Sequence, residues 1–175
     1  AKAALIALKK ANLSSEEVDL IIVATLSPDY IFPSTACLIQ NAIGATKAAA
    51  FDIQAACTGL IYALSVAKSF VESGVYKNVL VIGTEKISSF LDYEDRSTAI
   101  LFGDGATACL VTGDVKKGLA IGEIILGADG EQADILKVPG GGSRNPASLE
   151  TVAKKMHCIQ MNGQETFKHA VRRME

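Results

Sequence analysis

The chain has 175 residues, of which 49% are hydrophobic and 21% charged, and its formal net charge is −2 at pH 7. This composition predicts a globular protein with a buried core, and the near-neutral charge gives no general affinity for nucleic acid or anionic membranes. No apolar run reaches the roughly 18 residues that a membrane span needs, and we expect neither a membrane segment nor a signal peptide.

The cysteines are spread singly through apolar segments and form no CxxC pair, and the histidines show no ligand spacing with them. A zinc or other metal site is therefore not expected. Single thiols in this setting are typical of reduced intracellular proteins, so we expect a cytoplasmic location. These residues are Cys37, Cys57, Cys109, Cys158, His157 and His169.

Apolar periodicity predicts alternating helices and strands from the start of the chain. In chain order, the expected elements are helix 1–11, strand 18–26, helix 33–43, strand 48–53, helix 57–73, strand 78–86 and strand 102–114. This alternation predicts an α/β fold, with a parallel or mixed sheet between helices.

The pattern restarts after Lys117. It predicts a strand over 118–130, a hairpin and loop over 135–146, and a helix over 163–174. Because the chain begins and ends inside helical patterns, we expect it to be a fragment of a longer protein.

The stretch "FDIQAACTGLIYALSVAKSF", residues 51–70, places a lone thiol where a buried strand passes into an amphipathic helix. At a helix start, free N–H groups and the helix dipole favour an anion, which lowers the pKa of a thiol and activates it as a nucleophile. The same N–H groups can stabilise an oxyanion. Cys57 is therefore a candidate nucleophile, and the alternative is a small filler in a tight junction.

The residues around Cys57 show no GxSxG signature and no adjacent general base. Neither histidine is expected to be its partner, because both lie far downstream in the sequence. Cys37 falls inside a predicted helix and Cys109 inside a predicted strand, so both are expected in the core.

Three segments resemble β-ketoacyl-acyl-carrier-protein synthase III, a condensing enzyme of the thiolase superfamily. They are "FDIQAACTGLIYALSVAKSFVESG", "DRSTAILFGDGATACLV" and "IFPSTACLIQNAIG". The resemblance implies a thiolase-like α/β fold with a mixed five-stranded sheet and helices on both faces. The first half, lacking its first strand, would span 1–116, and the start of the second half would span 117–175.

The resemblance also implies an activity. Cys57 would take a short acyl group, usually acetyl, from acyl-CoA. The acyl-enzyme would then condense with malonyl-ACP and release carbon dioxide, which initiates fatty acid synthesis. Such an enzyme is a homodimer that uses no metal and no cofactor beyond its CoA thioester substrate, and its other partner is acyl carrier protein.

Other residues gain roles only through the resemblance. Arg96 matches the arginine that packs against the adenine of CoA; otherwise it would be a solvated partner of Asp95 or Glu94. Phe32 matches a residue that crosses the dimer interface to close the acyl pocket, and its bulk favours a short primer. The apolar lining of that pocket is matched by Ile87, Leu101 and Phe102, which would otherwise be core residues.

The chain departs from the family at both ends. The family's first strand, which we expect at the centre of the sheet, is absent, so its loss would leave two buried strand edges unpaired. The His and Asn that stabilise the enolate, and a Gly of the oxyanion architecture, also lie outside the sequence. We therefore expect the 175-residue chain alone not to complete the condensation.

Two alternatives remain open at the level of sequence. Related condensing enzymes that make hydroxymethylglutaryl-CoA, polyketides or alkylquinolones share the cysteine elbow. A non-catalytic α/β dimerisation module, with Cys57 in a structural role, is the alternative from a different class. Rapid alkylation of Cys57 near neutral pH would favour an enzyme.

Overall fold

A computed structural model describes residues 1–114 and 118–174 of the chain. The chain divides into two compact units: unit 1 comprises Ala1–Glu85 and Gly105–Leu126, and unit 2 comprises Lys86–Asp104 and Gly127–Glu175. The expected boundary between 116 and 117 falls on residues outside the described ranges.

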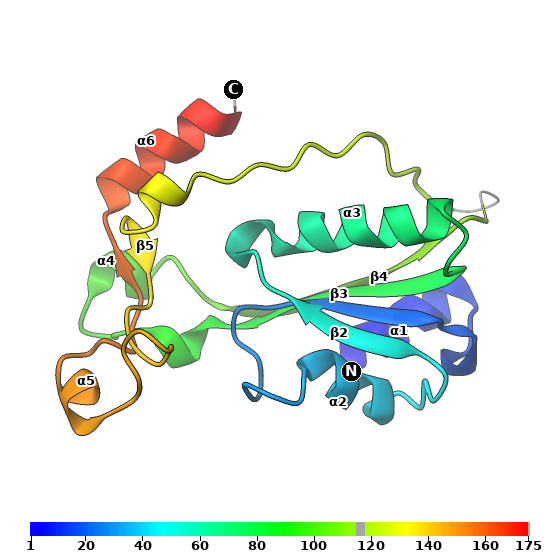
Figure 1. Ribbon diagram of the computed structural model, residues 1–175, viewed down its shortest axis with the longest axis horizontal. Coiled ribbons are helices and arrows are strands. Elements are labelled where there is room, and N and C mark those ends of the chain that lie inside the picture. Colours follow the sequence, from blue (N-terminus) through cyan, green and yellow to red (C-terminus); the bar gives the residue numbers. More distant parts are fainter. Residues whose placement is uncertain (115–117, 175) are drawn as a thin grey trace. The chain divides into compact units, whose positions relative to one another are not determined.

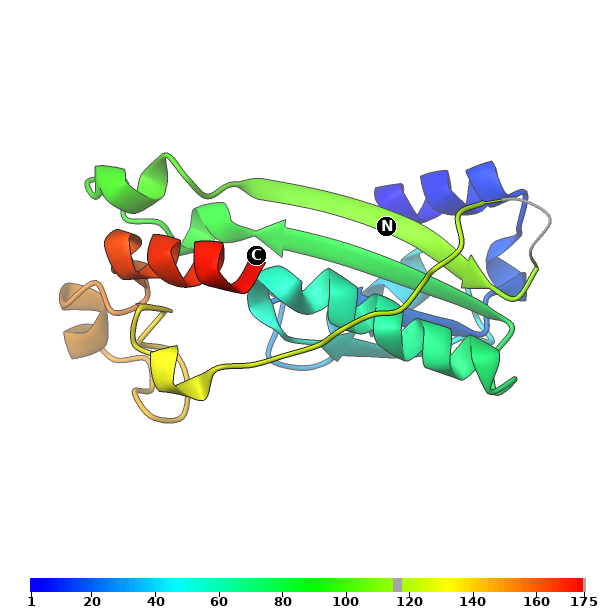
Figure 2. The same ribbon diagram turned by 90° about the horizontal axis from the view of Figure 1, so that it is seen from above.

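Unit 1 is built on a mixed sheet of four strands in the order β2-β1-β3-β4. β1 is parallel to both of its neighbours, whereas Figure 2 shows β3 and β4 running in opposite directions. The α/β architecture is confirmed, but among the described residues this sheet has four strands and not the expected five. The strands are β1 (Leu20–Ala24), β2 (Ala49–Ile53), β3 (Asn78–Lys86) and β4 (Asp104–Thr112).

The expectation of a gap at the centre of this sheet is wrong. β1 pairs directly with β3, from Leu20 opposite Val79 to Ala24 opposite Gly83. The backbone groups between these two strands therefore satisfy each other, and no buried edge separates them. The outer strands of the described sheet are β2 and β4.

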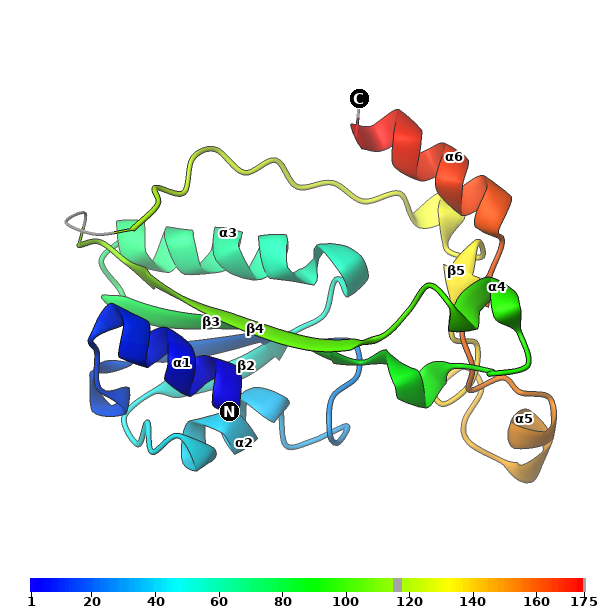
Figure 3. The same cartoon turned by 180° about the vertical axis from the view of Figure 1, so that it is seen from behind.

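Three helices cover the two faces of the sheet, which confirms the predicted helices of unit 1. The helices are α1 (Lys2–Ala11), α2 (Thr35–Ala42) and α3 (Gly59–Glu72). α3 lies on one face, and α1 and α2 lie on the other (Figures 1 and 3). The N-cap of α2 is Ser34, whose side chain accepts a hydrogen bond from the backbone N–H of Cys37, as expected for a serine before a helix.

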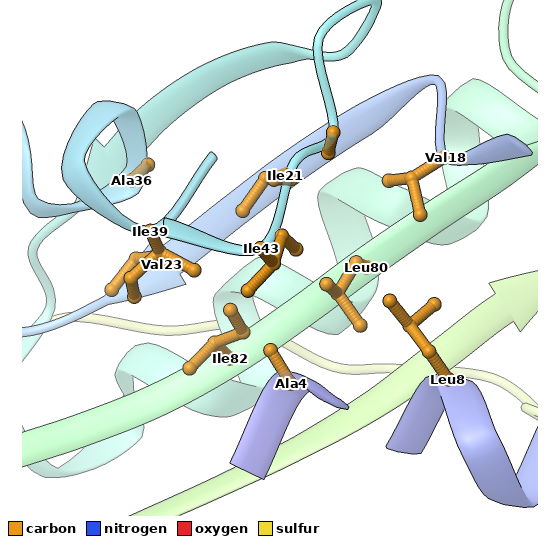
Figure 4. Packing of buried hydrophobic residues seen from close by; sticks show 11 residues of the cluster. Ala4, Leu8, Val18, Ile21, Val23, Ala36, Ile39, Ile43, Leu80 and Ile82 are labelled. Carbon is orange, nitrogen blue, oxygen red and sulfur yellow. The ribbon is translucent and has the colours of Figure 1, made fainter. Parts of the chain in front are cut away.

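The core lies on both faces of β1, because successive side chains of a strand point in opposite directions. Ile21 and Val23 pack with α1 and α2, as Figure 4 shows from close by. Leu20, Ile22 and Ala24 belong to the cluster under α3. Every residue of β1 is buried, which explains why the sequence of this strand is a continuous apolar run.

The described residues of unit 2 form three α-helices and a two-stranded sheet. They are α4 (Arg96–Ala99), β5 (Leu136–Lys137), α5 (Leu149–Ala153), β6 (Gln160–Met161) and α6 (Gly163–Met174). The predicted helix over 163–174 is confirmed, but the predicted hairpin within 135–146 is wrong. β5 pairs instead with β6, so its partner strand lies beyond α5 in the sequence.

The strand predicted over 118–130 does not form. Leu119 and Ile125 are 98% and 87% exposed, and this segment joins no sheet of the described residues. An apolar β-branched run becomes a strand only where another strand supplies hydrogen-bond partners. Here the carbonyl oxygen of Gly122 accepts a hydrogen bond from Lys68 Nζ at 2.7 Å instead.

The described residues contain neither a membrane-spanning helix nor a cluster of metal ligands. None of their helices combines the length and apolar character needed to cross a bilayer. They also contain no group of three or more His, Cys, Asp or Glu side chains arranged to hold a metal ion.

Candidate functional site

Cys57 lies in a tight turn between β2 and α3. After β2, the backbone of Ala56 takes a left-handed conformation with φ 44°, which is unfavourable for a residue with a Cβ. A single 3₁₀ turn, Ala56–Thr58, follows and leads directly into α3 at Gly59. The α-helix therefore starts two residues later than the predicted 57, and the exposed Cys57 lies within the 3₁₀ turn that leads into it.

Gly59 lets the start of α3 approach the sheet closely. A Cβ at this position would lie 3.3 Å from the Cβ of Ala24 in β1, which is tighter than ordinary packing. Gly59 is itself buried. Because Gly59 has no side chain, the turn that carries Cys57 can pack against the end of β1.

The start of α3 is not occupied by a capping side chain. The hydroxyl of Thr58 turns back and donates to the carbonyl oxygen of Ala55 at 2.8 Å. Within the described chain, no side chain caps α3 and no acidic residue stands in its first turn. The positive end of the helix dipole is therefore left for a ligand or for a charge that develops beside Cys57.

The other cysteines lie in different surroundings. Cys37 and Cys109 are exposed, so the expectation that both are core residues is wrong. α2 turns Ala36 and Ile39 toward the sheet and leaves Cys37 outside. Cys109 lies on the outer strand β4, yet neighbouring atoms desolvate its thiol and raise its pKa. Cys158 is half-buried.

The loop between β1 and α2 is anchored at both ends by carboxylates from neighbouring strands. At its start, Glu85 of β3 accepts hydrogen bonds from the backbone N–H of Leu26 at 3.0 Å and from the hydroxyl of Ser27. At its end, Asp52 of β2 accepts from the backbone N–H groups of Thr35 and Ala36, both at 2.7 Å. Both ends of the loop are thereby fixed to the sheet.

The tip of this loop presents apolar side chains to the outside of unit 1. Phe32 is 84% exposed, and Tyr30 and Ile31 beside it are exposed as well. Such a cluster on an anchored loop is typical of a surface that meets a partner. Phe32 and Cys57 both belong to unit 1.

Replacing Asp52 with alanine is expected to lower the free energy of unfolding of the full-length protein by roughly 2 kcal/mol. The change removes the acceptor for two N–H groups at the start of α2 and frees one end of the loop. Urea unfolding measures the loss. Glu16→Ala, at an exposed carboxylate, is the control; an equal loss in both variants would contradict the anchoring role of Asp52.

The remaining predicted site residues belong to unit 2. Ile87 is buried, Phe102 is half-buried and Leu101 is 63% exposed. The alternative interpretation of Leu101 as a core residue is therefore wrong. The short helix α4 that precedes it buries only Thr98. Arg96 is exposed at the first position of α4.

The two histidines also belong to unit 2, whereas Cys57 belongs to unit 1. His157 Nε2 lies 2.9 Å from the hydroxyl of Thr151. His169 is in the middle of α6.

Sequence reasoning missed three charged residues, two that anchor the loop of Phe32 in unit 1 and one that contacts the acidic residues before Arg96 in unit 2. Asp52 and Glu85 belong to parallel strands near their carboxyl ends, where functional groups of open α/β sheets gather, so their positions could have been noticed. Lys155 bonds to Asp92 and Glu94 across a long stretch of chain. No local pattern in the sequence indicates that contact.

The comparisons with known proteins agree with this geometry. The family model for 3-oxoacyl-[acyl-carrier-protein (ACP)] synthase III matches residues 51–130, which include Cys57 and Arg96. The beta-ketoacyl-[acyl-carrier-protein] synthase III of Chlamydia caviae is 56% identical over the whole chain, which covers 52% of that relative. The chain thus spans about half the length of the curated relatives it matches.

Solved structures give the same result. The crystal structure of 3-oxoacyl-[acyl-carrier-protein] synthase III from Aquifex aeolicus VF5 is 48% identical, with a TM-score of 0.80 over 98% of this chain and 50% of that one. Another 3-oxoacyl-(acyl-carrier-protein) synthase III structure is 32% identical, with a TM-score of 0.89 over 98% of this chain and 54% of that one. By sequence and by fold, the chain is similar to members of the 3-oxoacyl-[acyl-carrier-protein] synthase III family, and it spans about half of the members it matches.

Proposed function

We propose that the chain is the acyl-carrying part of a β-ketoacyl-ACP synthase III. The observation that carries this proposal is the exposed thiol of Cys57, which stands before the uncapped start of α3. The residues around it lie in the stretch that the family model matches. A nucleophile beside a helix start that no side chain caps is suited to acyl transfer through a covalent intermediate.

In the first half-reaction, the sulfur of Cys57 attacks the thioester carbonyl of a short acyl-CoA. The C–S bond to CoA breaks, the acyl group becomes a thioester of Cys57, and the proton of the thiol leaves with CoA. Backbone N–H groups at the elbow stabilise the oxyanion that forms on the way. Arg96 holds the CoA portion through its planar cation, which suits both an adenine ring and phosphates.

In the second half-reaction, malonyl-ACP loses carbon dioxide and leaves an enolate. The enolate carbon attacks the acyl carbonyl on Cys57, a C–C bond forms, and the sulfur leaves as 3-oxoacyl-ACP is released. The His and Asn that stabilise the enolate in the resembled enzymes lie outside this sequence, so we propose that the 175 residues do not complete this step alone. The chemistry needs no metal or further cofactor.

The proposal extends to assembly and location. The enzyme acts as a homodimer in the cytoplasm, with acyl-CoA and acyl carrier protein as partners in initiating fatty acid synthesis. Phe32, on the anchored loop, closes the acyl pocket of a second copy, and Ile87, Leu101 and Phe102 line a pocket of the same kind. Residues 1–116 form the first thiolase-like half, and 117–175 begin the second.

The proposal is tested by incubating the full-length protein with acetyl-CoA and malonyl-ACP. We expect acetoacetyl-ACP and carbon dioxide in equal amounts, and no product from the 175-residue chain alone. Failure of the full-length protein to form product would contradict the proposed activity. Turnover by the 175 residues at the full-length rate would contradict the need for groups outside them.

A further inference from the structure

Arg96 is surrounded in the sequence by carboxylates and yet pairs with none of them. Asp92, Glu94 and Asp95 precede it closely, and Asp95 is the N-cap of α4, the helix that Arg96 begins. Among the described residues, no ion pair joins Arg96 to any of the three. The guanidinium of Arg96 therefore stays available although a local pair would be the ordinary outcome.

Each of the three carboxylates has a partner other than Arg96. Lys155 Nζ lies 2.8 Å from Asp92 Oδ2 and also bonds to Glu94. Asp95 accepts from the backbone N–H of Ser97 at 2.9 Å and from the hydroxyl of Thr98, also at 2.9 Å. The capping contacts occupy Asp95. Lys155 is the cation that pairs with the other two, and Asp92 also accepts a hydrogen bond from the backbone N–H of Glu94 at 3.1 Å.

The contact between Lys155 and Asp92 shifts the pKa of each of these two groups toward its charged form. The hydrogen bond from Lys155 is the main cause of a lowered pKa at Asp92, and the bonds to Asp92 and Glu94 raise the pKa of Lys155. Near neutral pH one cation thus faces two anions. A phosphate-bearing ligand near Arg96 would meet less repulsion than the acidic sequence suggests.

The backbone fixes Lys155 in its place. Its φ is 52°, a left-handed conformation that a lysine adopts rarely. Cys158 N–H donates to the carbonyl oxygen of Lys155 at 3.2 Å. One residue further on, Ile159 N–H donates to the carbonyl oxygen of Phe90 at 2.7 Å, which ties this segment to the chain just before Asp92.

We infer that Lys155 is a positioning residue for the recognition of CoA phosphates: it takes up Asp92 and Glu94, which would otherwise pair with Arg96, and so leaves the guanidinium free. The inference rests on the proposed function, since Arg96 must contact the acyl-CoA. Lys155 and Glu94 are both more than half exposed, and exposed ion pairs add little to stability. The function of this contact is therefore to hold the charges of Asp92 and Glu94 away from Arg96.

The test is steady-state kinetics of the full-length protein with acetyl-CoA varied. For Lys155→Ala we expect the KM for acetyl-CoA to rise about tenfold while kcat stays within about twofold. Lys154→Ala is the matched control, because it removes the same charge from the preceding residue. The partner of Lys154 is Glu150, at 2.6 Å. We expect that control to leave KM unchanged.

A second variant separates charge from backbone shape. Lys155→Gly removes the cation but suits the left-handed φ, so it preserves the turn if Lys155→Ala fails to fold. We expect Lys155→Gly to raise KM as Lys155→Ala does. Adding Asp92→Asn and Glu94→Gln to Lys155→Ala should restore KM, because the carboxylates that compete for Arg96 are then gone.

Two results would overturn the inference. One is a KM in Lys155→Gly equal to that of the unchanged protein. The other is that Lys155→Ala raises KM in the Arg96→Ala background as much as it does in the unchanged protein. If Lys155 acts through Arg96, it should have no effect on KM once the guanidinium is removed. An unchanged KM in Arg96→Ala alone would instead count against the proposed role of Arg96, which keeps the two failures distinct.

Discussion

Replacing Cys57 with serine is expected to slow acetyl transfer from acetyl-CoA to the full-length protein by on the order of 10⁴-fold or more. Serine keeps the size of the side chain and its place before α3, but a hydroxyl with no adjacent base is a far weaker nucleophile than a thiol. The measurement is the initial rate of CoA release, followed with a thiol reagent or by chromatography.

Cys37→Ser is the matched control for this prediction. Cys37 is also exposed, but it stands within α2, beside the hydroxyl of its N-cap Ser34, whose Oγ lies 3.2 Å from the sulfur. We expect that variant to release CoA at the unchanged rate. Equal rates for both variants and the unchanged protein would show that the thiol of Cys57 takes no part in the transfer.

Replacing Phe32 with alanine is expected to raise the rate of acylation by hexanoyl-CoA relative to acetyl-CoA by roughly 50-fold. If the phenyl ring fills the far end of the acyl pocket of a second copy, its removal makes room for about three more methylenes. Each methylene that becomes buried contributes roughly 0.8 kcal/mol. Competition between the two thioesters, read by mass spectrometry of the acyl-enzyme, gives the ratio directly.

Tyr30→Ala tests whether any aromatic ring on the loop would limit the length of the acyl chain. Tyr30 is exposed on the same anchored loop, and we expect its removal to leave the ratio unchanged. The unchanged protein should strongly prefer acetyl-CoA to dodecanoyl-CoA. A preference of the unchanged protein for the long chain would rule out Phe32 as the limit on chain length.

The central part of the fold could be predicted from sequence because its signals are local. The apolar run of β1 reflects burial on both faces of one strand. The change from strand to helical periodicity around Cys57 placed that thiol at a helix start. The helix begins later, at Gly59, because the chain first completes a 3₁₀ turn, and periodicity does not distinguish the two kinds of turn.

The errors concern features that depend on distant partners. The run at 118–130 has the composition of a strand but no strand beside it, and β5 pairs with a segment beyond α5. Leu101 is apolar yet exposed. Hydrophobicity predicts a preference for burial but does not say which element is there to provide it.

The same reasoning applies to the candidate site. Cys57 could be singled out because a nucleophile at a helix start has a recognisable local pattern. The carboxylates that anchor the Phe32 loop could have been suspected from their positions near strand ends. Lys155 could not, because its contacts with Asp92 and Glu94 arise only when the chain folds back on itself.

The most direct test uses labelled acetyl-CoA and the full-length protein without malonyl-ACP. With no second substrate, the acyl-enzyme accumulates and its peptides can be sequenced by mass spectrometry after digestion at low pH. We predict a single acetyl group, on the peptide that contains Cys57, held as a thioester that hydroxylamine removes. Label on Cys37, Cys109 or Cys158 with Cys57 unmodified would contradict the assignment of Cys57 as the acyl carrier.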